Sequence, residues 1–457
     1  MVPTLAVAQV ERYELGRRLR LFEAAWEKWD CHEARQRALP LLRPLTGQFF
    51  SFRFAEAGRT LDRATFALQA ADGPPAGRRW AAALQIVPQS RLLDETTTEL
   101  IVTVQPFYQP DVPLPPNARL RLWFTNQSTV SVAVQTWPVT VRVPLPPLND
   151  HTGLDRRLYV LLDVRGNLEP ASVGISQVRH LRARLERLKA ACDKLPRHCE
   201  LEAATIRTRL QAWQAALQGE TPITDFPYAL WLDNAELMAA GRPFFTPERQ
   251  GQFWITLPTG SAGSVPCRLF VPKGLQKHQP VPLVVALHGA GVDENMFFDS
   301  YGAGQIVREC QQRGWMLLSP RAGLLGPPPV PQLIDTLAQR YPIDRKRVFL
   351  VGHSMGAAHA MAVALRQPDA YTAVAALGGA PRIAQVQALQ RLPFFLAVGT
   401  HDSLAINGAR KLHQQLTTAQ LPHYHYREYP ELEHLLIVRQ ALPDVFAFFD
   451  KFVKPTP

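Results

Sequence analysis

The stretch RVFLVGHSMGAA, residues 347–358, restricts the fold of this chain more than any other. Five strand-like residues lead into Ser354, which stands between Gly352 and Gly356, and the small residues that follow open a helix. A sharp strand-to-helix turn strains the serine backbone, and glycines on both sides remove collisions with the adjacent chain. The pattern predicts a nucleophilic serine at the end of a buried strand. The alternative is that Ser354 is only a turn residue.

After Gln250, apolar runs begin to alternate with helical stretches. The runs are QFWITLP, VPCRLFVP, VPLVVALHG, GWMLLSPRA, RVFLVGHSMG, YTAVAALGG, PFFLAVGTHD and HYREYPELEH. Near-continuous apolar strands between helices are typical of a mostly parallel sheet that is buried on both faces. Ligands of such sheets lie beyond the carboxyl ends of the strands. We therefore predict an α/β fold, a doubly wound and mostly parallel sheet, over residues 251–457, with functional residues directly after its strands.

Two residues that follow predicted strands are suited to activate Ser354. Asp402 ends FFLAVGTHD, and His434 follows the last strand in YPELEHLL. A serine hydroxyl needs a base to take its proton, and the base needs an acid that holds its tautomer. The chain order Ser, Asp, His is the one this kind of fold uses. We predict His434 as base and Asp402 as acid, although Asp402 could instead cap the next helix. Three other histidines are alternative bases: His401, His423 and His425.

The loop after VVAL supplies the third requirement, a pair of N–H donors for a tetrahedral oxyanion. Its sequence HGAG, residues 288–291, contains small residues that permit a tight turn. We predict the backbone N–H groups of Met355 and Ala290 as the donors. His288 is expected to stabilise the loop rather than to act as a catalytic base.

Apolar side chains near the predicted site are candidates for an acyl or aromatic pocket. They follow the oxyanion loop, the acid and the base in the sequence: Phe297, Phe298, Leu404, Leu435 and Leu436. The same residues can equally be core residues at the ends of helices. No inserted segment longer than LLGPPPVPQ could cover the site, so an open site is expected.

Five motifs occur in a fixed order over residues 250–454: CRLFVPKG, LHGAG, GHSMGAA, VGTHD and EH. With them the chain resembles the α/β-hydrolase superfamily, in particular serine esterases related to polyhydroxybutyrate depolymerases, feruloyl esterases and dienelactone hydrolases. The resemblance implies Ser354, Asp402 and His434 as a triad that hydrolyses a small-molecule or polymer ester through an acyl-enzyme, with no metal or organic cofactor. One departure is that DSLAINGAR, after the acid, lacks the Val-Pro pair often seen in these families.

Two other functions stay open as alternatives. The same motifs resemble the catalytic domain of prolyl-oligopeptidase-type peptidases, which often carry β-rich N-terminal domains, so a serine peptidase is the second hypothesis. The third is a surface- or carbohydrate-binding protein that uses aromatic side chains in the β-rich segment: Phe107, Tyr108, Trp123 and Trp137. Such aromatics are more typical of a core. A complete triad would also be hard to explain in a protein that only binds.

The first 250 residues resemble no family that we can name. Residues 1–79 are predicted to be helical, with one run over 5–39 that ends at Pro40 and Pro44. Residues 80–168 hold short β-branched runs between proline-rich turns, which are typical of a small antiparallel sandwich. Residues 169–250 predict a helical hairpin, broken at Pro196, and a connector. These parts are expected to act as scaffold or targeting modules, or to position the partner in a homo-oligomer.

Composition excludes some classes of partner. Apolar residues make up 46% and charged residues 19% of the 457 residues, and no long uninterrupted apolar window predicts a transmembrane segment. The net charge of +11 is spread along the chain without a nucleic-acid-binding motif, so nucleic acid is not expected as a partner. A Cys192–Cys199 bridge and secreted relatives favour a secreted or periplasmic location, whereas two free thiols and the lack of a visible signal sequence favour the cytoplasm.

Overall fold

The structure of this protein is a computed structural model that describes residues 2–29, 31–149, 151–260, 263–383 and 386–453. The chain divides into two compact units, which are described one at a time. The first unit contains residues 1–199 and 206–242, and the second contains residues 200–205 and 243–457. Residue 30, inside the expected N-terminal helical run, lies outside the described residues. In the described part of the chain, no helix is both long and apolar enough to cross a membrane.

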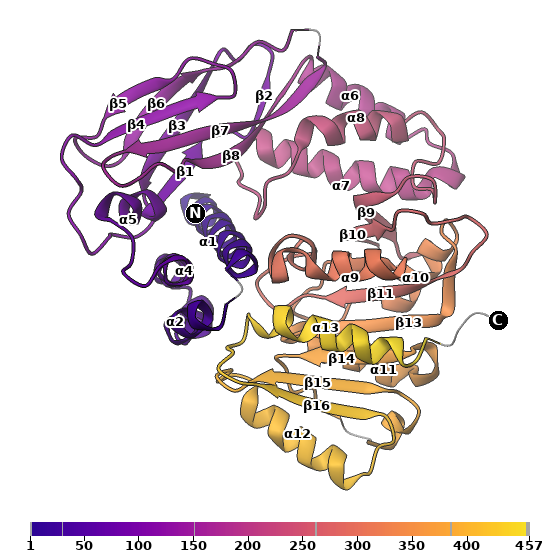
Figure 1. Cartoon of the computed structure of the whole chain (residues 1–457). Helices are drawn as coiled ribbons and strands as arrows, with labels where there is room; N and C mark the ends of the chain where they lie inside the picture. Colours follow the sequence, from indigo (N-terminus) through magenta and orange to yellow (C-terminus); the bar gives the residue numbers. More distant parts are fainter. Residues whose placement is uncertain (1, 30, 150, 261–262, 384–385, 454–457) are drawn as a thin grey trace. The chain divides into compact units, whose positions relative to one another are not determined.

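Helices open the first unit (Figure 1): α1 Val2–Lys28, α2 His32–Leu42, α3 Leu45–Phe50, α4 Phe54–Gln69 and α5 Ala76–Ala83. Helices α1, α2 and α3 all pack against α4. The expected end of a helix at Pro40 is wrong, because Pro40 lies inside α2. A proline this close to a helix end removes only one hydrogen bond, and the buried residues Leu39 and Leu42 hold the last turn in place.

Two sheets follow the helices of the first unit. Their strands are β1 Leu84–Pro88, β2 Leu92–Asp94, β3 Glu99–Pro106, β4 Arg119–Phe124, β5 Val130–Ala133, β6 Val139–Pro144, β7 Gly153–Asp163 and β8 Ala171–Val178. The three-stranded sheet has the order β1-β3-β6, and the five-stranded sheet has the order β2-β8-β7-β4-β5. Buried and exposed residues alternate along β6, as expected of a strand with one face on a core.

The sheet continues beyond residue 168, where the sequence predicted its end. Strand β8 pairs with both β7 and β2. Its sequence ASVGISQV hides the strand signal, because only Val173, Ile175 and Val178 supply strongly apolar side chains to the core. Of the aromatic residues considered for surface binding, Phe107 is buried, Trp123 stacks on Tyr159 and Trp137 stacks on Trp80.

Three further helices follow β8: α6 Leu181–Cys192, α7 Glu200–Leu217 and α8 Tyr228–Met238. Cys192 and Cys199 are both buried, at the end of α6 and directly before α7. The first turn of α7 belongs to the second unit. There the buried Glu202 carboxylate accepts the backbone N–H groups of Phe244 and Phe245 at 2.8 Å and 3.3 Å.

The second unit is built on an eight-stranded sheet with the order β16-β15-β14-β13-β11-β12-β10-β9. Its strands are β9 Gly251–Pro258, β10 Ser264–Val271, β11 Val281–Leu287, β12 Met316–Pro320, β13 Ile343–His353, β14 Ala373–Leu377, β15 Phe394–Gly399 and β16 Tyr424–Tyr429. Strand β10 pairs antiparallel with β9 and β12, and all other neighbours are parallel. The mostly parallel sheet predicted from the sequence is confirmed.

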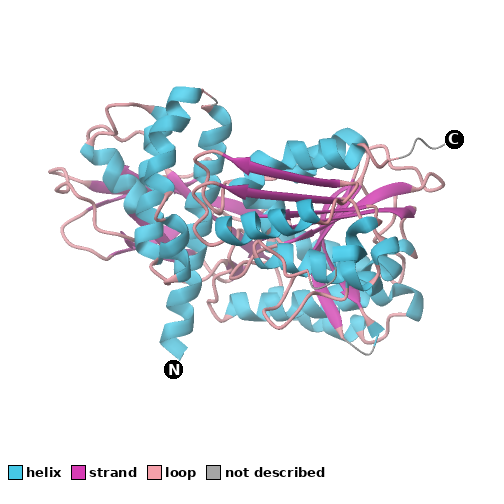
Figure 2. Cartoon of the chain, turned by 90° about the horizontal axis from the view of Figure 1, so that it is seen from below, coloured by secondary structure: helices cyan, strands magenta, loops and turns pink. Residues whose placement is uncertain are grey.

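Helices cover both faces of this sheet (Figures 1 and 2). They are α9 Gln305–Arg313, α10 Val330–Ala338, α11 Met355–Arg366, α12 Ile406–Thr418 and α13 Ile437–Asp450. The strands β11, β14 and β15 are almost entirely buried, which explains their continuous apolar runs. The parallel strands point their carboxyl ends to one edge, and the segments after β11, β13, β15 and β16 meet there.

Candidate active site

Ser354 occupies a sharp turn between β13 and α11. Its backbone has φ 56° and ψ −118°, a conformation that residues other than glycine rarely adopt. The Ser354 N–H donates to the carbonyl oxygen of Leu377 at 2.9 Å, which ties the turn to the end of β14. A Cβ atom at Gly352 would lie 2.0 Å from the Gly356 oxygen, and one at Gly356 would lie 1.9 Å from the Leu287 oxygen. Only glycine fits at either position.

Asp402 and His434 form a buried hydrogen-bonded pair. Oδ2 of Asp402 accepts the Nδ1–H of His434 at 2.8 Å, and both side chains are almost fully buried. Oδ1 of the same carboxylate accepts the backbone N–H groups of Leu404 and Ala405, each at 3.1 Å. The carboxylate therefore stabilises the start of α12 as well as the imidazole. A proton on Nδ1 makes Nε2 the basic nitrogen of His434.

The alternative histidines have other surroundings. The His401 ring lies 3.6 Å from the Glu431 carboxylate, His423 packs edge-on against Phe452, and His425 stacks on Phe395. Within the described ranges, His434 is the histidine whose side chain hydrogen-bonds to Asp402.

The loop after β11 is held by His288. Its Nδ1–H donates to the Gly289 oxygen at 2.8 Å, and its Nε2 accepts the N–H of Ala322 at 3.0 Å. Burial lowers the pKa of His288 and keeps the ring neutral, as both hydrogen bonds require. These contacts are those of the loop-stabilising residue that the sequence predicted.

The two expected oxyanion donors flank Ser354 in different ways. Met355 begins α11, and Ala290 follows Gly289, whose position is so close that a Cβ atom there would lie 3.4 Å from the Ser354 Cβ. Among the residues that the structure describes, neither the Met355 N–H nor the Ala290 N–H has an acceptor in a turn, loop or side chain. Both amides are available to a bound group.

The candidate pocket residues divide into two classes. Phe297 and Phe298 are buried: the first packs edge-on against Tyr301, and the second lies under the guanidinium of Arg268 at 4.6 Å. Both rings therefore occupy the core in this structure, as the alternative interpretation held. Leu404 is 57% exposed and Leu435 is half-buried, so these two side chains can reach a ligand.

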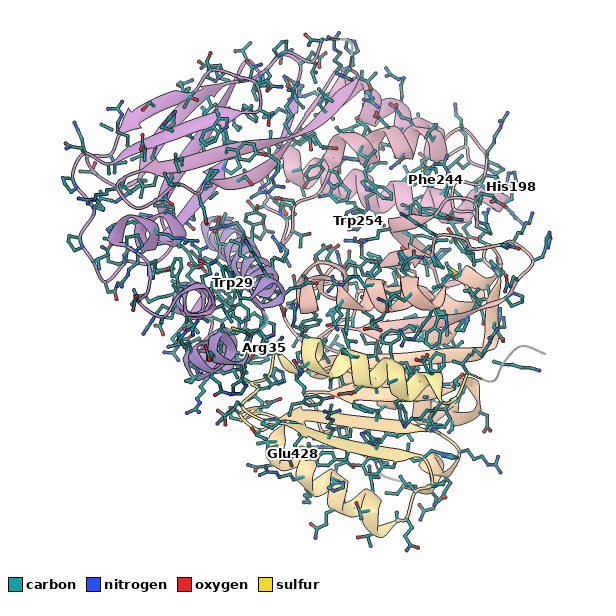
Figure 3. The ribbon with its side chains drawn as sticks, in the orientation of Figure 1. Trp29, Arg35, His198, Phe244, Trp254 and Glu428 are labelled. Atoms are coloured by element: carbon teal, nitrogen blue, oxygen red, sulfur yellow. The ribbon has the colours of Figure 1, made fainter. Side chains whose placement is uncertain are left out.

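The segment that follows the oxyanion loop is fastened to the antiparallel end of the sheet. The Asn295 Oδ1 atom accepts Nη1–H of Arg268 at 2.7 Å and Nε1–H of Trp254 at 2.8 Å. Trp254 lies on β9 (Figure 3), and the Arg268 guanidinium stacks over its ring at 3.9 Å. Nearby, burial and the charge of Glu294 raise the pKa of Asp293 to about 6.

Comparison with known proteins gives a match within the second unit. Residues 331–434 match a family model named Esterase and described as "Putative esterase", and this range contains Ser354, Asp402 and His434. The strand order of the second unit and the serine turn after β13 are those of an α/β-hydrolase fold. Ester hydrolysis is the activity class that the match supports.

Solved structures of esterases are similar to this chain at low identity. A feruloyl esterase module from Clostridium thermocellum is 15% identical, with 46% of this chain and 92% of that chain covered and a TM-score of 0.40. An S-formylglutathione hydrolase from Staphylococcus aureus is 16% identical, with 44% and 99% covered and a TM-score of 0.37. A thermostable esterase is 15% identical, with 80% and 98% covered and a TM-score of 0.40. At these TM-scores, the fold assignment rests on the topology and the family match.

Two residues of the hydrolase site were not singled out from the sequence. The Tyr301 hydroxyl lies 2.6 Å from Nδ1 of His353, and Nε2 of His353 lies 2.8 Å from the carbonyl oxygen of His434. Tyr301 also accepts the N–H of Gly289. If Tyr301 donates to Nδ1, then Nε2–H donates to His434, and one neutral tautomer satisfies both bonds. A histidine in the second position of GHSMG, at the buried end of a strand, was the signal that could have found them.

The His353 ring is surrounded on every side. It packs against the rings of Tyr301 and His434, with centroids 4.9 Å and 4.7 Å apart. Burial and the neighbouring His434 lower the pKa of His353 well below its usual range. His353 therefore stays neutral at the pH values at which a serine hydrolase works. In the described ranges, no cluster of three or more His, Cys, Asp or Glu side chains is arranged to hold a metal ion.

Proposed function

We propose that this chain is a serine carboxylic ester hydrolase that acts through an acyl-enzyme on Ser354. One observation carries the proposal: Asp402 and His434 form a buried hydrogen bond, and Ser354 has the strained turn conformation of a nucleophile. The contact between His353, the residue before the serine, and the His434 carbonyl supports the nearness of nucleophile and base.

Hydrolysis proceeds in two halves. The Ser354 hydroxyl attacks the ester carbonyl while Nε2 of His434 takes its proton, and the same nitrogen returns the proton to the leaving alcohol. Asp402 accepts from Nδ1–H, which fixes the tautomer and stabilises the imidazolium. Water then attacks the acyl-enzyme, again with His434 as base, and releases the carboxylic acid.

The N–H groups of Met355 and Ala290 stabilise the negative charge of each tetrahedral intermediate by hydrogen bonds. One donor stands at the N-terminus of α11, where the helix dipole also favours negative charge. Loss of one such donor typically costs about 3–4 kcal/mol of transition-state stabilisation. Leu404 and Leu435 are the side chains proposed to contact the acyl group.

Tyr301 and His353 act as positioning residues. The chain of contacts from the Gly289 N–H through Tyr301 and His353 to the His434 carbonyl joins the oxyanion loop, the serine turn and the base loop. Each of these segments follows a different strand. A shift of one of them by a fraction of an ångström would weaken the alignment that catalysis requires.

The test is hydrolysis of p-nitrophenyl esters, from acetyl to long-chain, by the wild type and Ser354→Ala. We expect ester turnover in the wild type and a loss on the order of 10⁴-fold or more in kcat for the variant. A proline-containing peptidyl amide is measured in parallel. Faster cleavage of the amide than of every ester would assign the chain to the serine peptidases instead, and equal rates for variant and wild type would refute the role of Ser354.

A further inference from the structure

The loop between β12 and α10 presents two leucines to solvent. Gly323 and Gly326 form an antiparallel bridge, so Leu324 and Leu325 are the two residues at the tip of a tight hairpin. Leu324 is 78% exposed, and Leu325 is fully exposed. Single exposed leucines are common on protein surfaces, whereas two adjacent ones at one tip form a small apolar patch that a ligand can cover. We call residues 323–326 the leucine hairpin.

The segments on both sides of the leucine hairpin are held in place. Before it, the Arg321 guanidinium donates to both oxygens of the buried Glu294 carboxylate at 2.6 Å and 2.8 Å. The Arg321 N–H donates to the Pro266 oxygen at 2.9 Å. After the hairpin, residues 327–329 are three prolines, whose rings fix φ. The loop is therefore held through its ends, and the leucine side chains are left available to a ligand.

One side chain joins the leucine hairpin to the expected oxyanion loop. Nε2 of His288 accepts the N–H of Ala322, directly before the hairpin, at 3.0 Å, and Nδ1–H donates to the Gly289 oxygen at 2.8 Å. Gly289 lies so near the serine that a Cβ atom built on it would be 3.4 Å from the Ser354 Cβ. The leucine hairpin is thus fastened to the surroundings of Ser354 through a single residue.

The strand order places the leucine hairpin on one side of Ser354. The hairpin follows β12, the HGAG loop follows β11 and Ser354 follows β13, and these strands are parallel neighbours in the order β13-β11-β12. At about 4.8 Å between neighbouring strands, β12 lies on the order of 10 Å from β13. Leu404 and Leu435 follow β15 and β16, on the other side of β13. Exposed and half-buried leucines therefore occur on both sides of Ser354.

The two halves of an ester extend in different directions from its carbonyl carbon. The proposed function assigns the acyl half to Leu404 and Leu435, which leaves the side of the leucine hairpin for the alcohol half. A short alcohol ends before it reaches this hairpin, whereas an alkyl chain of several carbons can cover the two leucines. The apolar surface that the chain and the leucines then remove from water stabilises the complex.

We infer that the hydrolase site takes esters of long-chain apolar alcohols, whose alkyl chain contacts Leu324 and Leu325. These two residues then determine the preference for the alcohol, a role that rests on the proposed ester hydrolysis at Ser354.

Two isomeric esters test this preference on the full chain. Octyl acetate carries its long chain in the alcohol, and ethyl octanoate carries it in the acid. Hydrolysis is followed by titration of the released acid, below the solubility limit of each ester. For the double variant Leu324→Ser/Leu325→Ser, we expect kcat/KM for octyl acetate to fall on the order of 10- to 100-fold, because the alkyl chain loses its apolar contacts. Ethyl octanoate and ethyl acetate should be hydrolysed as by the wild type.

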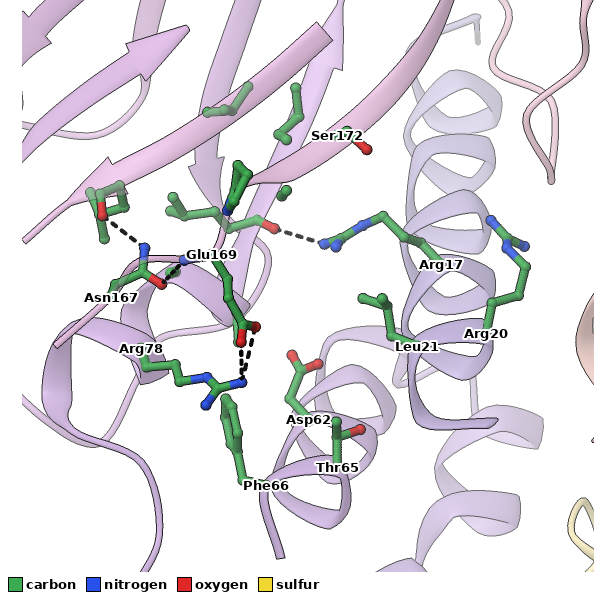
Figure 4. Close-up of a pocket in the computed structure, with 18 of the residues that line it drawn as sticks. Arg17, Arg20, Leu21, Asp62, Thr65, Phe66, Arg78, Asn167, Glu169 and Ser172 are labelled. Atoms are coloured by element: carbon green, nitrogen blue, oxygen red, sulfur yellow. Dashed lines mark hydrogen bonds and ion pairs between the residues drawn. The ribbon is translucent and has the colours of Figure 1, made fainter. Parts of the chain in front are cut away.

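The matched control is Leu21→Ser, at a position of the first unit that is 51% exposed. Leu21 lines a cavity of about 470 Å³ between α1, α4, α5 and the strands β1, β7 and β8 (Figure 4). The cavity has room for an alkyl chain, but its walls carry charges: Arg78 pairs with Glu169 at 2.9 Å, and Arg157 pairs with Asp225 at 3.2 Å. The control should therefore hydrolyse both isomers as the wild type does.

Three results would overturn the role of the leucine hairpin: a wild-type kcat/KM of the double variant for octyl acetate, an equal loss for ethyl octanoate, or the same loss in Leu21→Ser. In each case, ethyl acetate turnover that depends on Ser354 would leave the proposed ester hydrolysis intact. A wild type that hydrolyses none of the three esters, or Ser354→Ala that hydrolyses them equally fast, would overturn both.

Discussion

The Tyr301 hydroxyl belongs to a hydrogen-bonded chain that reaches three loops of the hydrolase site. It accepts from the Gly289 N–H and contacts His353 at 2.6 Å, and His353 in turn contacts the His434 backbone. We propose that these contacts hold the His434 loop and the HGAG loop in register with the serine turn.

Tyr301→Phe is therefore expected to lower kcat for p-nitrophenyl esters on the order of 10-fold while KM changes little, because misalignment affects the transition state more than substrate binding. Tyr426→Phe is the matched control, since its hydroxyl bonds Glu428 on β16. An unchanged kcat for Tyr301→Phe, or a rise in KM alone, would show that the hydroxyl serves only the packing of the core.

Asp293 makes the free energy of unfolding depend on pH. Its pKa of about 6 lies above the unfolded value of 3.8, so the folded state holds the proton more tightly. The stabilisation is complete below about pH 4 and is lost as pH rises through 6, where the partly buried carboxylate must ionise. Asp293→Asn should therefore raise the free energy of unfolding at pH 8 by about 1–3 kcal/mol and have little effect at pH 4.

Urea unfolding at the two pH values measures this effect. Asp369→Asn, at an exposed position, serves as the control. The account of Asp293 fails if its substitution stabilises the protein equally at pH 4 and pH 8, or destabilises it at pH 8.

At the scale of single elements, the strand–turn–helix segment from β13 to α11 was predicted in full from GHSMG and its surroundings. Two glycines define the geometry so tightly that few other turns are compatible with the motif. The ends of other elements were harder to predict. Pro40 continues α2 because neighbouring apolar residues are buried, and β8 was missed because glycine and small polar residues, which weaken the strand signal, make up half of it.

Gly356→Ala tests the tightness of the turn. The new Cβ atom would lie 1.9 Å from the Leu287 oxygen, so β11 and α11 must separate. We expect a loss of about 3 kcal/mol or more in the free energy of unfolding, together with loss of ester hydrolysis.

The matched substitution is Gly47→Ala in α3, where a Cβ atom would meet nothing within 4 Å. Because alanine favours helices more than glycine, this variant should be neutral or more stable by up to about 1 kcal/mol. Equal effects of the two substitutions would contradict the packing argument.

At the scale of the whole molecule, the sequence predicted the second unit far better than the first. The catalytic motifs mark strand ends, so the sheet could be laid out around them. The first unit offers no such marks. Its helices and strands were recognised by their periodicity, yet the charged cavity between them combines α1, α4, α5 and β8, which lie far apart in the sequence. The orientation of side chains such as Phe297 was equally hard to predict from the sequence, because an aromatic residue after a loop can face a ligand or the core.

The most direct test of the whole account is covalent labelling. The full chain is treated with a fluorophosphonate that carries an alkyl group, and the product is analysed by intact mass and peptide mapping. We expect one label per chain, on Ser354, with loss of ester hydrolysis in proportion to labelling, and no label on Ser354→Ala or, in the same time, on His434→Ala. A label on another residue, or full esterase activity in a chain labelled at Ser354, would contradict the assignment of the nucleophile.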